Sequence, residues 1–131
     1  MPPDLKAADR EPPLKVIGQL KGLETLDLGG FKVTDDQLSL LKGLTELRRL
    51  SVVGSPLTDA GVAQLGSFKK LELVNLAGTQ VTDVGLEHLR KLATLQHLGL
   101  QRTKVSKAGI ERLKAALPAA RIEWEESSAQ H

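Results

Sequence analysis

The sequence predicts an α/β solenoid in which short parallel strands line one face and short helices line the other. Three observations carry this prediction: a repeat of constant length, apolar positions at strand spacing within each repeat, and apolar positions at helix spacing after them. The chain has 131 residues, and its only aromatic side chains are Phe31, Phe68 and Trp124. We therefore expect one domain with an aliphatic, leucine-rich core.

Four segments of the chain align without a gap at a spacing of 24 residues. They are LETLDLGGFKVTDDQL from residue 23, LRRLSVVGSPLTDAGV from residue 47, LELVNLAGTQVTDVGL from residue 71 and LQHLGLQRTKVSKAGI from residue 95. Leu14 and Ile17 fit the second half of a preceding repeat, and the chain leaves the pattern after a fifth start at residue 119. We expect a half repeat, four full repeats and a terminal strand within residues 14–125, between flexible segments at 1–13 and 126–131.

Each repeat is expected to begin with a strand and to continue as a helix. Two apolar columns lie two residues apart, as in a strand with one buried face; they contain Leu26, Leu50, Val74, Leu98 and Ile122, and Leu28, Val52, Leu76, Leu100 and Trp124. Later apolar residues follow at steps of three, which is helix spacing, as shown by Leu86, Leu89, Leu92 and Leu95. Five strands joined through helices imply parallel pairing and a sheet about 20 Å wide.

The segment that joins strand to helix has its own signals, which are clearest in the third repeat. Gly78 lets the chain bend away from the strand, and Val81 returns to the core. Either Thr82 or Asp83 then caps the helix, and the carboxylate also favours the positive end of the helix dipole.

The helix ends carry further polar signals. In the first repeat, Thr34 and Gln37 have the spacing of a capping box. Four basic residues lie near the C-terminal ends of the predicted helices: Lys42, Arg90, Lys91 and Lys114. We interpret them as complementing the negative end of the helix dipole. The alternative interpretation is a basic stripe that binds a ligand.

Both ends of the predicted solenoid need a cap, because they would otherwise expose core residues. At the front, Pro12 and Pro13 suit a first helical turn, and an apolar stripe follows at Leu14, Ile17, Leu20 and Leu23. At the rear, Ile122 and Trp124 are expected to face the last core layer. The alternate residues should face outward as charges that discourage strand addition, namely Arg121, Glu123 and Glu125.

The pattern LxxLxLxxTxVTDxGLxxL resembles the leucine-rich repeat, in the variant that contains a TDxGL segment. That variant occurs in bacterial leucine-rich-repeat proteins and in the cysteine-containing repeats of eukaryotic F-box proteins. The family's Asn or Cys position is occupied here by other residues: Phe31, Ser55, Thr79 and Thr103. The resemblance covers residues 14–124 and implies a right-handed leucine-rich-repeat solenoid, with a parallel five-stranded concave sheet and short helices on the convex side.

The strand residues that flank the core columns form the candidate partner-binding surface. In the implied fold they face the concave side, and they vary from repeat to repeat while the core columns hardly change. Leu73, Val53 and Ala77 would give an apolar centre with polar neighbours, as in protein interfaces. The alternative is that Leu73 is one of the isolated exposed leucines that are common on protein surfaces. The whole set is Arg49, Ser51, Val53, Leu73, Asn75, Ala77, His97 and Gln101.

Other kinds of site find little support. There is no cysteine, and no histidine has a partner at metal-ligand spacing, so no metal or cofactor is expected. Asp27, Ser51 and His97 could suggest a catalytic set, but Ser51 and His97 would lie two strands apart, roughly 9–10 Å, which is too far for a nucleophile and its base. The TD segments place an aspartate at the same position of three repeats, and the fourth repeat has Lys107 there: Asp35, Asp59 and Asp83. Helix capping explains these aspartates without a cation site.

We therefore expect a non-catalytic protein–protein interaction module that presents a rigid concave surface to a protein partner. The net charge is only +2, and positively and negatively charged residues are interspersed along the chain. This pattern argues against nucleic acid or a membrane as the partner. The absence of a signal peptide or a membrane span in the printed sequence leads us to expect a cytoplasmic protein. We also expect a monomer. One alternative is an adaptor or effector fragment of a larger regulatory protein, F-box-like or signalling; an enzyme is the third possibility.

Overall fold

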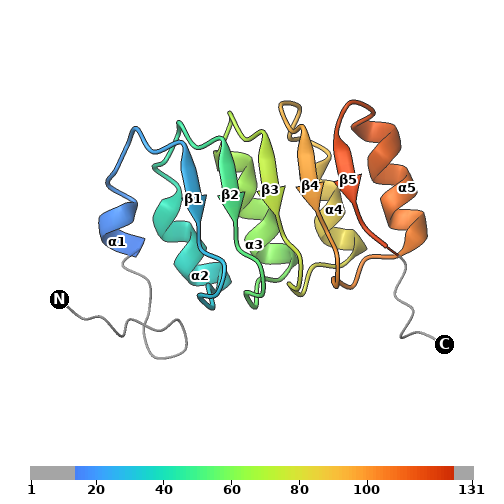
Figure 1. The fold of residues 1–131 in the computed structure, drawn as a ribbon, viewed down its shortest axis with the longest axis horizontal. Helices are drawn as coiled ribbons and strands as arrows, with labels where there is room; N and C mark the ends of the chain where they lie inside the picture. Colours follow the sequence, from blue (N-terminus) through green and yellow to red (C-terminus); the bar gives the residue numbers. More distant parts are fainter. Residues whose placement is uncertain (1–13, 126–131) are drawn as a thin grey trace.

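The computed structural model describes residues 14–125, which form one row of repeats with strands on one face and helices on the other (Figure 1). The strands are β1 (Thr25–Asp27), β2 (Arg49–Ser51), β3 (Leu73–Asn75), β4 (His97–Gly99) and β5 (Arg121–Glu123). The helices are α1 (Leu14–Ile17), α2 (Asp35–Leu38), α3 (Asp59–Ala63), α4 (Asp83–Leu89) and α5 (Lys107–Ala116), with 3-10 turns η1 (Ser39–Leu41) and η2 (Gln64–Ser67). Pro12, Pro13 and the two expected flexible segments lie outside the described residues.

The five strands form one parallel sheet in the order in which they occur in the sequence. Equivalent residues of successive repeats pair with one another, so Arg49 lies beside Leu73 and Leu73 beside His97. The predicted fold class and strand register are confirmed. A constant repeat length therefore places each repeat position in a straight row across the sheet.

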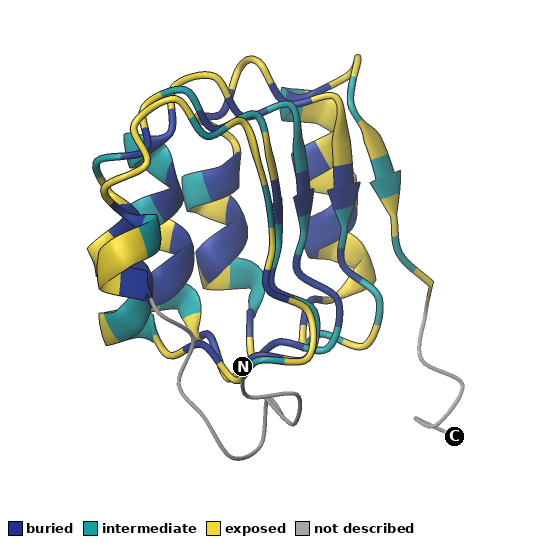
Figure 2. Cartoon of the chain, turned by 60° about the vertical axis from the view of Figure 1, so that its left-hand side comes forward, coloured by how far each residue is buried: buried dark blue, intermediate teal, exposed yellow. Residues whose placement is uncertain are grey.

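The buried residues lie between the sheet and the helices (Figure 2), and apart from Phe68 the core that they form is aliphatic, as expected. Leu50 and Val74 of the central strands are fully buried. At the C-terminal end, Ile122 and Trp124 are partly buried and pack against the core, which confirms their predicted capping role.

The helices are shorter than the apolar steps of three suggested. Helix α4 ends at Leu89, and the steps continue through turns, in which the Leu92 N–H donates to the Leu89 carbonyl (3.1 Å) and the Leu95 N–H to the Leu92 carbonyl (3.0 Å). At the front, Leu20 and Leu23 follow α1 in turns of the same kind, which extend the row of apolar residues beyond the helix. A step of three is the period of 3-10 geometry, so the pattern marks successive turns as well as helix.

Hydroxyl groups cap the helices, which decides between the two predicted cap residues. The Thr82 hydroxyl accepts a hydrogen bond from the Val84 N–H (3.2 Å), and Thr58 caps α3 in the same way. The predicted capping box is present in α2: the Thr34 hydroxyl accepts from the Gln37 N–H (3.2 Å), and the Gln37 side chain accepts from the Thr34 N–H (3.0 Å).

The aspartates beside these caps have a second role, which the sequence pattern within one repeat does not predict. The Asp59 carboxylate accepts from the N–H (2.8 Å) and the hydroxyl (2.5 Å) of Thr82, one repeat further along the chain. Asp35 binds Thr58 and Asp83 binds Ser106 through the same pair of hydrogen bonds. Each carboxylate therefore fastens the start of one helix to the start of the next.

The glycine of the TDxGL segment makes room for this carboxylate. A Cβ atom at Gly85 would lie 2.5 Å from Asp59 Oδ1, which is closer than real Cβ contacts come. Gly61 and Gly109 lie against the preceding repeat's aspartate in the same way. Thr, Asp and Gly of the motif are thus one structural unit that spans two repeats.

The turns that leave the strands depend on left-handed backbone and on buried hydroxyl groups. Gly78 has φ +75°, and Arg102 occupies the equivalent position with φ +57°. At the family's Asn or Cys position, the Ser55 hydroxyl donates to the Phe31 carbonyl (2.8 Å) and accepts from the Val33 N–H (3.1 Å). This buried hydroxyl links adjacent turns at the position where the family has Asn or Cys.

Candidate functional site

The candidate residues lie in rows across the open face of the sheet (Figure 1). The strand register places Arg49, Leu73 and His97 in one row, and Ser51 and Asn75 in the next. The third row lies just beyond the strands, where neighbouring turns are joined by backbone hydrogen bonds: Val53, Ala77 and Gln101.

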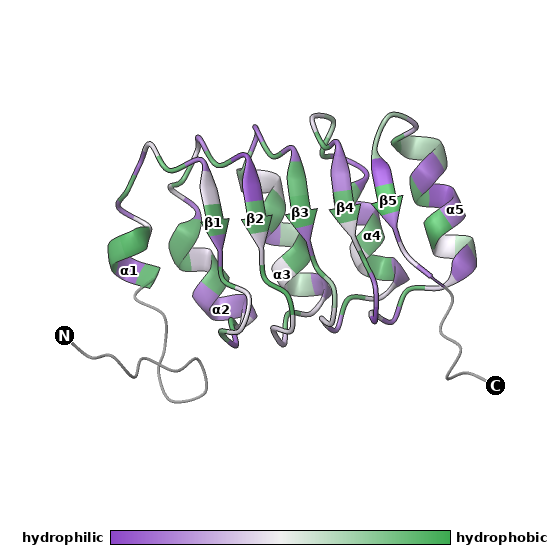
Figure 3. Ribbon diagram, viewed as in Figure 1, coloured by the Kyte–Doolittle hydropathy of each residue, from purple (hydrophilic) through white to green (hydrophobic). Residues whose placement is uncertain are grey.

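The exposure of these residues differs across the surface. Arg49 and His97 are exposed and Leu73 between them is partly exposed, so β3 begins apolar between the hydrophilic starts of β2 and β4 (Figure 3). Val53 is also partly exposed, but Ala77 is only 5% exposed and offers little surface. The apolar centre at the sheet therefore consists mainly of Leu73, with Val53 toward the turns.

A shallow hollow of about 120 Å³ lies beside Leu73. Gly99 leaves this space because it has no side chain, and a Cβ there would lie 2.6 Å from Asn75 Oδ1. Leu73, Asn75, His97 and Glu123 are among the residues that line the hollow. A single side chain of a partner could enter it, with an apolar wall on one side and polar groups on the others.

The two rows on the strands carry different charges. The row of Leu73 contains Arg49, His97 and Arg121, whereas the next row ends in Asp27 and Glu123. Arg121 Nε lies 3.6 Å from Glu123 Oε2, so the rows are joined by an ion pair at β5.

The possible catalytic set is not brought together. Ser51 on β2 and His97 on β4 are separated by β3, and two strand spacings amount to roughly 9–10 Å. Within residues 14–125, no group of three or more histidine, cysteine or acidic side chains is placed to hold a metal ion. The same part of the chain contains no helix with the length and apolar character needed to cross a membrane.

Ion pairs between repeats gather at the edge where the helices end and the strands begin. Arg48 Nη1 lies 2.6 Å from Glu72 Oε2, and Lys70 Nζ lies 2.8 Å from Glu46 Oε1. The hydrogen bond from Lys70, and then its positive charge, lower the pKa of the Glu46 carboxyl.

Solved structures with the same arrangement come from several organisms. Internalin C2 of Listeria monocytogenes superposes with a TM-score of 0.68 at 25% identity, over 87% of this chain and 49% of its own. A leucine-rich-repeat protein of Leptospira interrogans superposes with a TM-score of 0.59 at 25% identity, over 86% of this chain and 34% of its own. The chain is a leucine-rich-repeat protein.

A third structure, of a plant peptide hormone receptor in complex with its hormone, shares the fold of this leucine-rich-repeat protein with a TM-score of 0.57. The identity is 20%, over 88% of this chain and 19% of the receptor. The leucine-rich-repeat protein spans about half the length of the internalin C2 structure and about a third of the Leptospira one. No protein-family model matches the sequence, and no curated protein sequence is significantly similar to it. The F-box subtype has no counterpart among these three structures.

Two members of this surface were absent from the predicted set. Gly99 opens the hollow, and Glu123 forms one of its walls. The signal in the sequence was a glycine in a column that otherwise holds polar or charged residues: Asp27, Ser51, Asn75 and Glu123.

Proposed function

We propose that this leucine-rich-repeat protein is a non-catalytic interaction module that binds a protein partner through the sheet face centred on Leu73. One observation carries the proposal. The rows beneath the sheet hold nearly constant apolar residues, whereas the rows above it vary and place a partly exposed leucine between exposed polar side chains. An apolar centre with a polar rim is the usual composition of a protein interface.

The surface is suited to binding with little rearrangement. The sheet pairs through all five strands, its central core residues are fully buried, and the aspartates fasten each helix start to the next. A preformed surface loses less conformational entropy when a partner binds. In this proposal Leu73 packs against the partner, and Arg49 and His97 set its orientation. The hollow over Gly99 receives one partner side chain.

The proposal is tested by capture from an extract of the source cells with three baits. The first is the natural protein, and the second carries Leu73→Glu and Arg49→Glu in the proposed surface. The third carries Val84→Glu and Arg112→Glu on α4 and α5, which alters the net charge by the same amount at exposed helix positions. Far-ultraviolet circular dichroism first shows that all three baits are equally folded.

A protein retained by the natural and helix-variant baits, but lost from the sheet-variant bait, supports the proposal. Retention by the sheet variant and loss from the helix variant would place the interface on the helices and contradict it. Retention of the same protein by all three baits would also contradict it, because neither surface would then be needed.

A further inference from the structure

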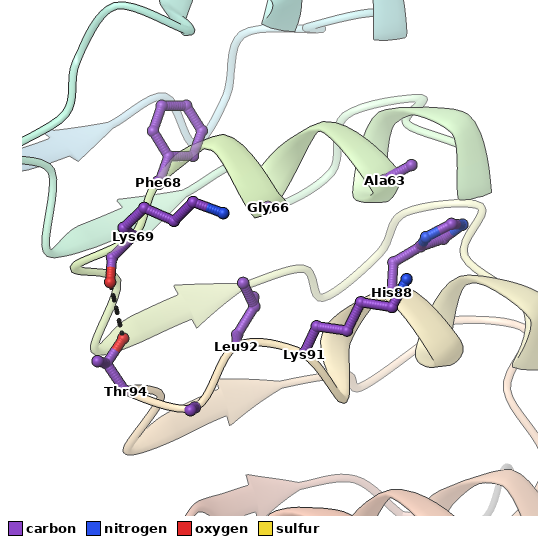
Figure 4. Close-up of a pocket in the computed structure, with 9 residues that line it drawn as sticks. Ala63, Gly66, Phe68, Lys69, His88, Lys91, Leu92 and Thr94 are labelled. Atoms are coloured by element: carbon purple, nitrogen blue, oxygen red, sulfur yellow. Dashed lines mark hydrogen bonds between the residues drawn. The ribbon is translucent and has the colours of Figure 1, made fainter.

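A larger pocket lies away from the sheet face, between η2 and the turn that follows α4 (Figure 4). Its volume is about 470 Å³. Phe68 and Leu92 form the floor but are almost completely buried, with exposed fractions of 1% and 6%, so the apolar surface that a ligand can reach includes the exposed side chains of Ala63 and Ala93. Lys69 reaches over the floor from one side, and Lys91 and His88 stand on the other (Figure 4).

This pocket arises from departures of one repeat from the pattern of the others. Gly66 stands where the other full repeats have long basic side chains, namely Lys42, Arg90 and Lys114, although the N-terminal half repeat also has a glycine there, Gly18. A Cβ atom at Gly66 would meet nothing within 4 Å, so the space beside it is open. Ala63 likewise stands where the other repeats have Ser39, Glu87 and Glu111. The second repeat therefore lacks both a long cation and a carboxylate that would otherwise occupy this place.

The two lysines of the pocket also differ from the residues at the equivalent positions of the other full repeats. In the other full repeats the positions equivalent to Lys69 hold uncharged residues, which are Thr45, Ala93 and Leu117, and the N-terminal half repeat has Lys21 there. The positions equivalent to Lys91 are also uncharged, and they hold Gly43, Ser67 and Ala115. The fold accommodates small or apolar residues at both positions, so its architecture does not require these charges.

The basic groups of the pocket form no ion pair with any acidic residue in the described part of the chain. Nearby cations are neutralised, since Lys70 pairs with Glu46 (2.8 Å) and Arg90 with Glu87 (2.7 Å). Within residues 14–125, the side chains of Lys69, His88 and Lys91 form no ion pair. Unpaired cations at the rim of a partly apolar pocket favour a ligand with both negative charge and an apolar part.

We propose that this pocket binds an acidic segment of a protein partner. An apolar side chain of the segment enters the pocket and packs against Ala63 and Ala93, and carboxylates on either side of it meet Lys69 and Lys91. A peptide can place carboxylates on both sides of an apolar group, whereas a simple inorganic anion would leave the exposed apolar lining uncovered. The site is separate from the sheet face and does not depend on the function proposed there.

The test is a nuclear magnetic resonance titration of the full ¹⁵N-labelled chain at low salt. The probe is a synthetic peptide with blocked ends, in which a leucine is flanked on each side by two glutamates. We expect saturable shifts of the amide signals of Gly66, Lys69, Lys91 and Leu92. A peptide with glutamine in place of each glutamate, and one with serine in place of the leucine, should each bind about fivefold more weakly or worse.

Three variants separate a shaped site from general attraction between charges. Gly66→Lys restores the residue type of the other repeats and adds a positive charge, but it fills the pocket, so we expect weaker binding. Lys91→Glu should also weaken binding. Lys107→Glu changes the net charge equally at an exposed position at the start of α5, and the affinity should stay unchanged.

Several results would overturn the proposal. They are the absence of saturable shifts at the four amides, tighter binding by Gly66→Lys, and equal losses in Lys91→Glu and Lys107→Glu. Equal binding of the serine peptide, or displacement of the peptide by inorganic phosphate at the same concentration, would show that the site recognises charge alone. Either of these results also overturns the proposal.

Discussion

Removal of the Asp59 carboxylate should destabilise the protein more than removal of any ordinary surface acid. The carboxylate accepts two hydrogen bonds from Thr82, from the N–H at 2.8 Å and from the hydroxyl at 2.5 Å. Both residues are partly buried, so water replaces these bonds incompletely when the acceptor is deleted. The change Asp59→Ala thus leaves the start of α4 detached from the preceding repeat.

The expected loss can be estimated from these contacts. A hydrogen bond to a charged group contributes about 1.5–3 kcal/mol, and the partial exposure of the pair favours the lower end of that range. Two such bonds give a loss of about 3 kcal/mol in the free energy of unfolding. Urea-induced unfolding followed by far-ultraviolet circular dichroism measures it. Asp36→Ala is the matched control, because Asp36 is an exposed acid in the first turn of α2 and should lose less than about 1 kcal/mol through the helix dipole.

A double-mutant cycle with Gly85 tests the same contact from the other side. Alanine is the better helix former by about 1 kcal/mol, yet Gly85→Ala should destabilise the natural protein because the new Cβ would lie 2.5 Å from Asp59 Oδ1. In the Asp59→Ala background this cost should fall by about 1 kcal/mol or more. Additive effects of the two changes, or a loss in Asp59→Ala no larger than in Asp36→Ala, would refute the role assigned to the carboxylate.

Three further changes have definite expected outcomes. Leu76→Ala should cost about 2–5 kcal/mol in unfolding free energy because Leu76 is fully buried, whereas Leu73→Ala should cost much less, and equal losses by urea unfolding would contradict the strand register. Ser55→Ala should cost about 1–3 kcal/mol, since it leaves a buried backbone N–H without its acceptor, and a thermal midpoint unchanged from the natural protein would contradict this. Lys70→Ala should raise the pKa of Glu46 toward its ordinary value, as measured by carboxyl-carbon nuclear magnetic resonance, and no upward movement would mean that the ion pair is not formed in solution.

The constant repeat length predicts the strand register, the spacing of apolar residues within each repeat predicts strands and helices, and the resemblance to the leucine-rich repeat supplies the solenoid. The column of Leu26, Leu50, Val74 and its successors is the row that the sheet pairs side by side. Helix lengths were less predictable. A step of three residues fits a helix and a chain of 3-10 turns equally well, so Leu92 and Leu95 were assigned to a helix that ends at Leu89.

Contacts between repeats were the part that the sequence analysis missed. Asp59 was assigned to its own helix, since capping is local in sequence and its partner Thr82 is 23 residues away. Once the register is known, the pairing of each aspartate with a glycine one repeat later becomes a visible signal, as in Asp59 and Gly85. The sheet surface was predictable as a set of rows, but the burial of Ala77 depends on side-chain packing that column patterns do not report.

The most direct test of the sheet-face proposal is a comparison of two affinities for one captured partner by isothermal titration calorimetry. Leu73→Ala removes the apolar centre of the proposed surface. Val84→Ala is the control, because Val84 is an apolar residue of α4 that is 65% exposed. We expect Leu73→Ala to weaken binding by about 2 kcal/mol, or roughly thirtyfold, as for a central interface residue, and Val84→Ala to leave the affinity unchanged. Equal affinities of the two variants, or a loss confined to Val84→Ala, would contradict the assignment of the sheet face as the binding surface.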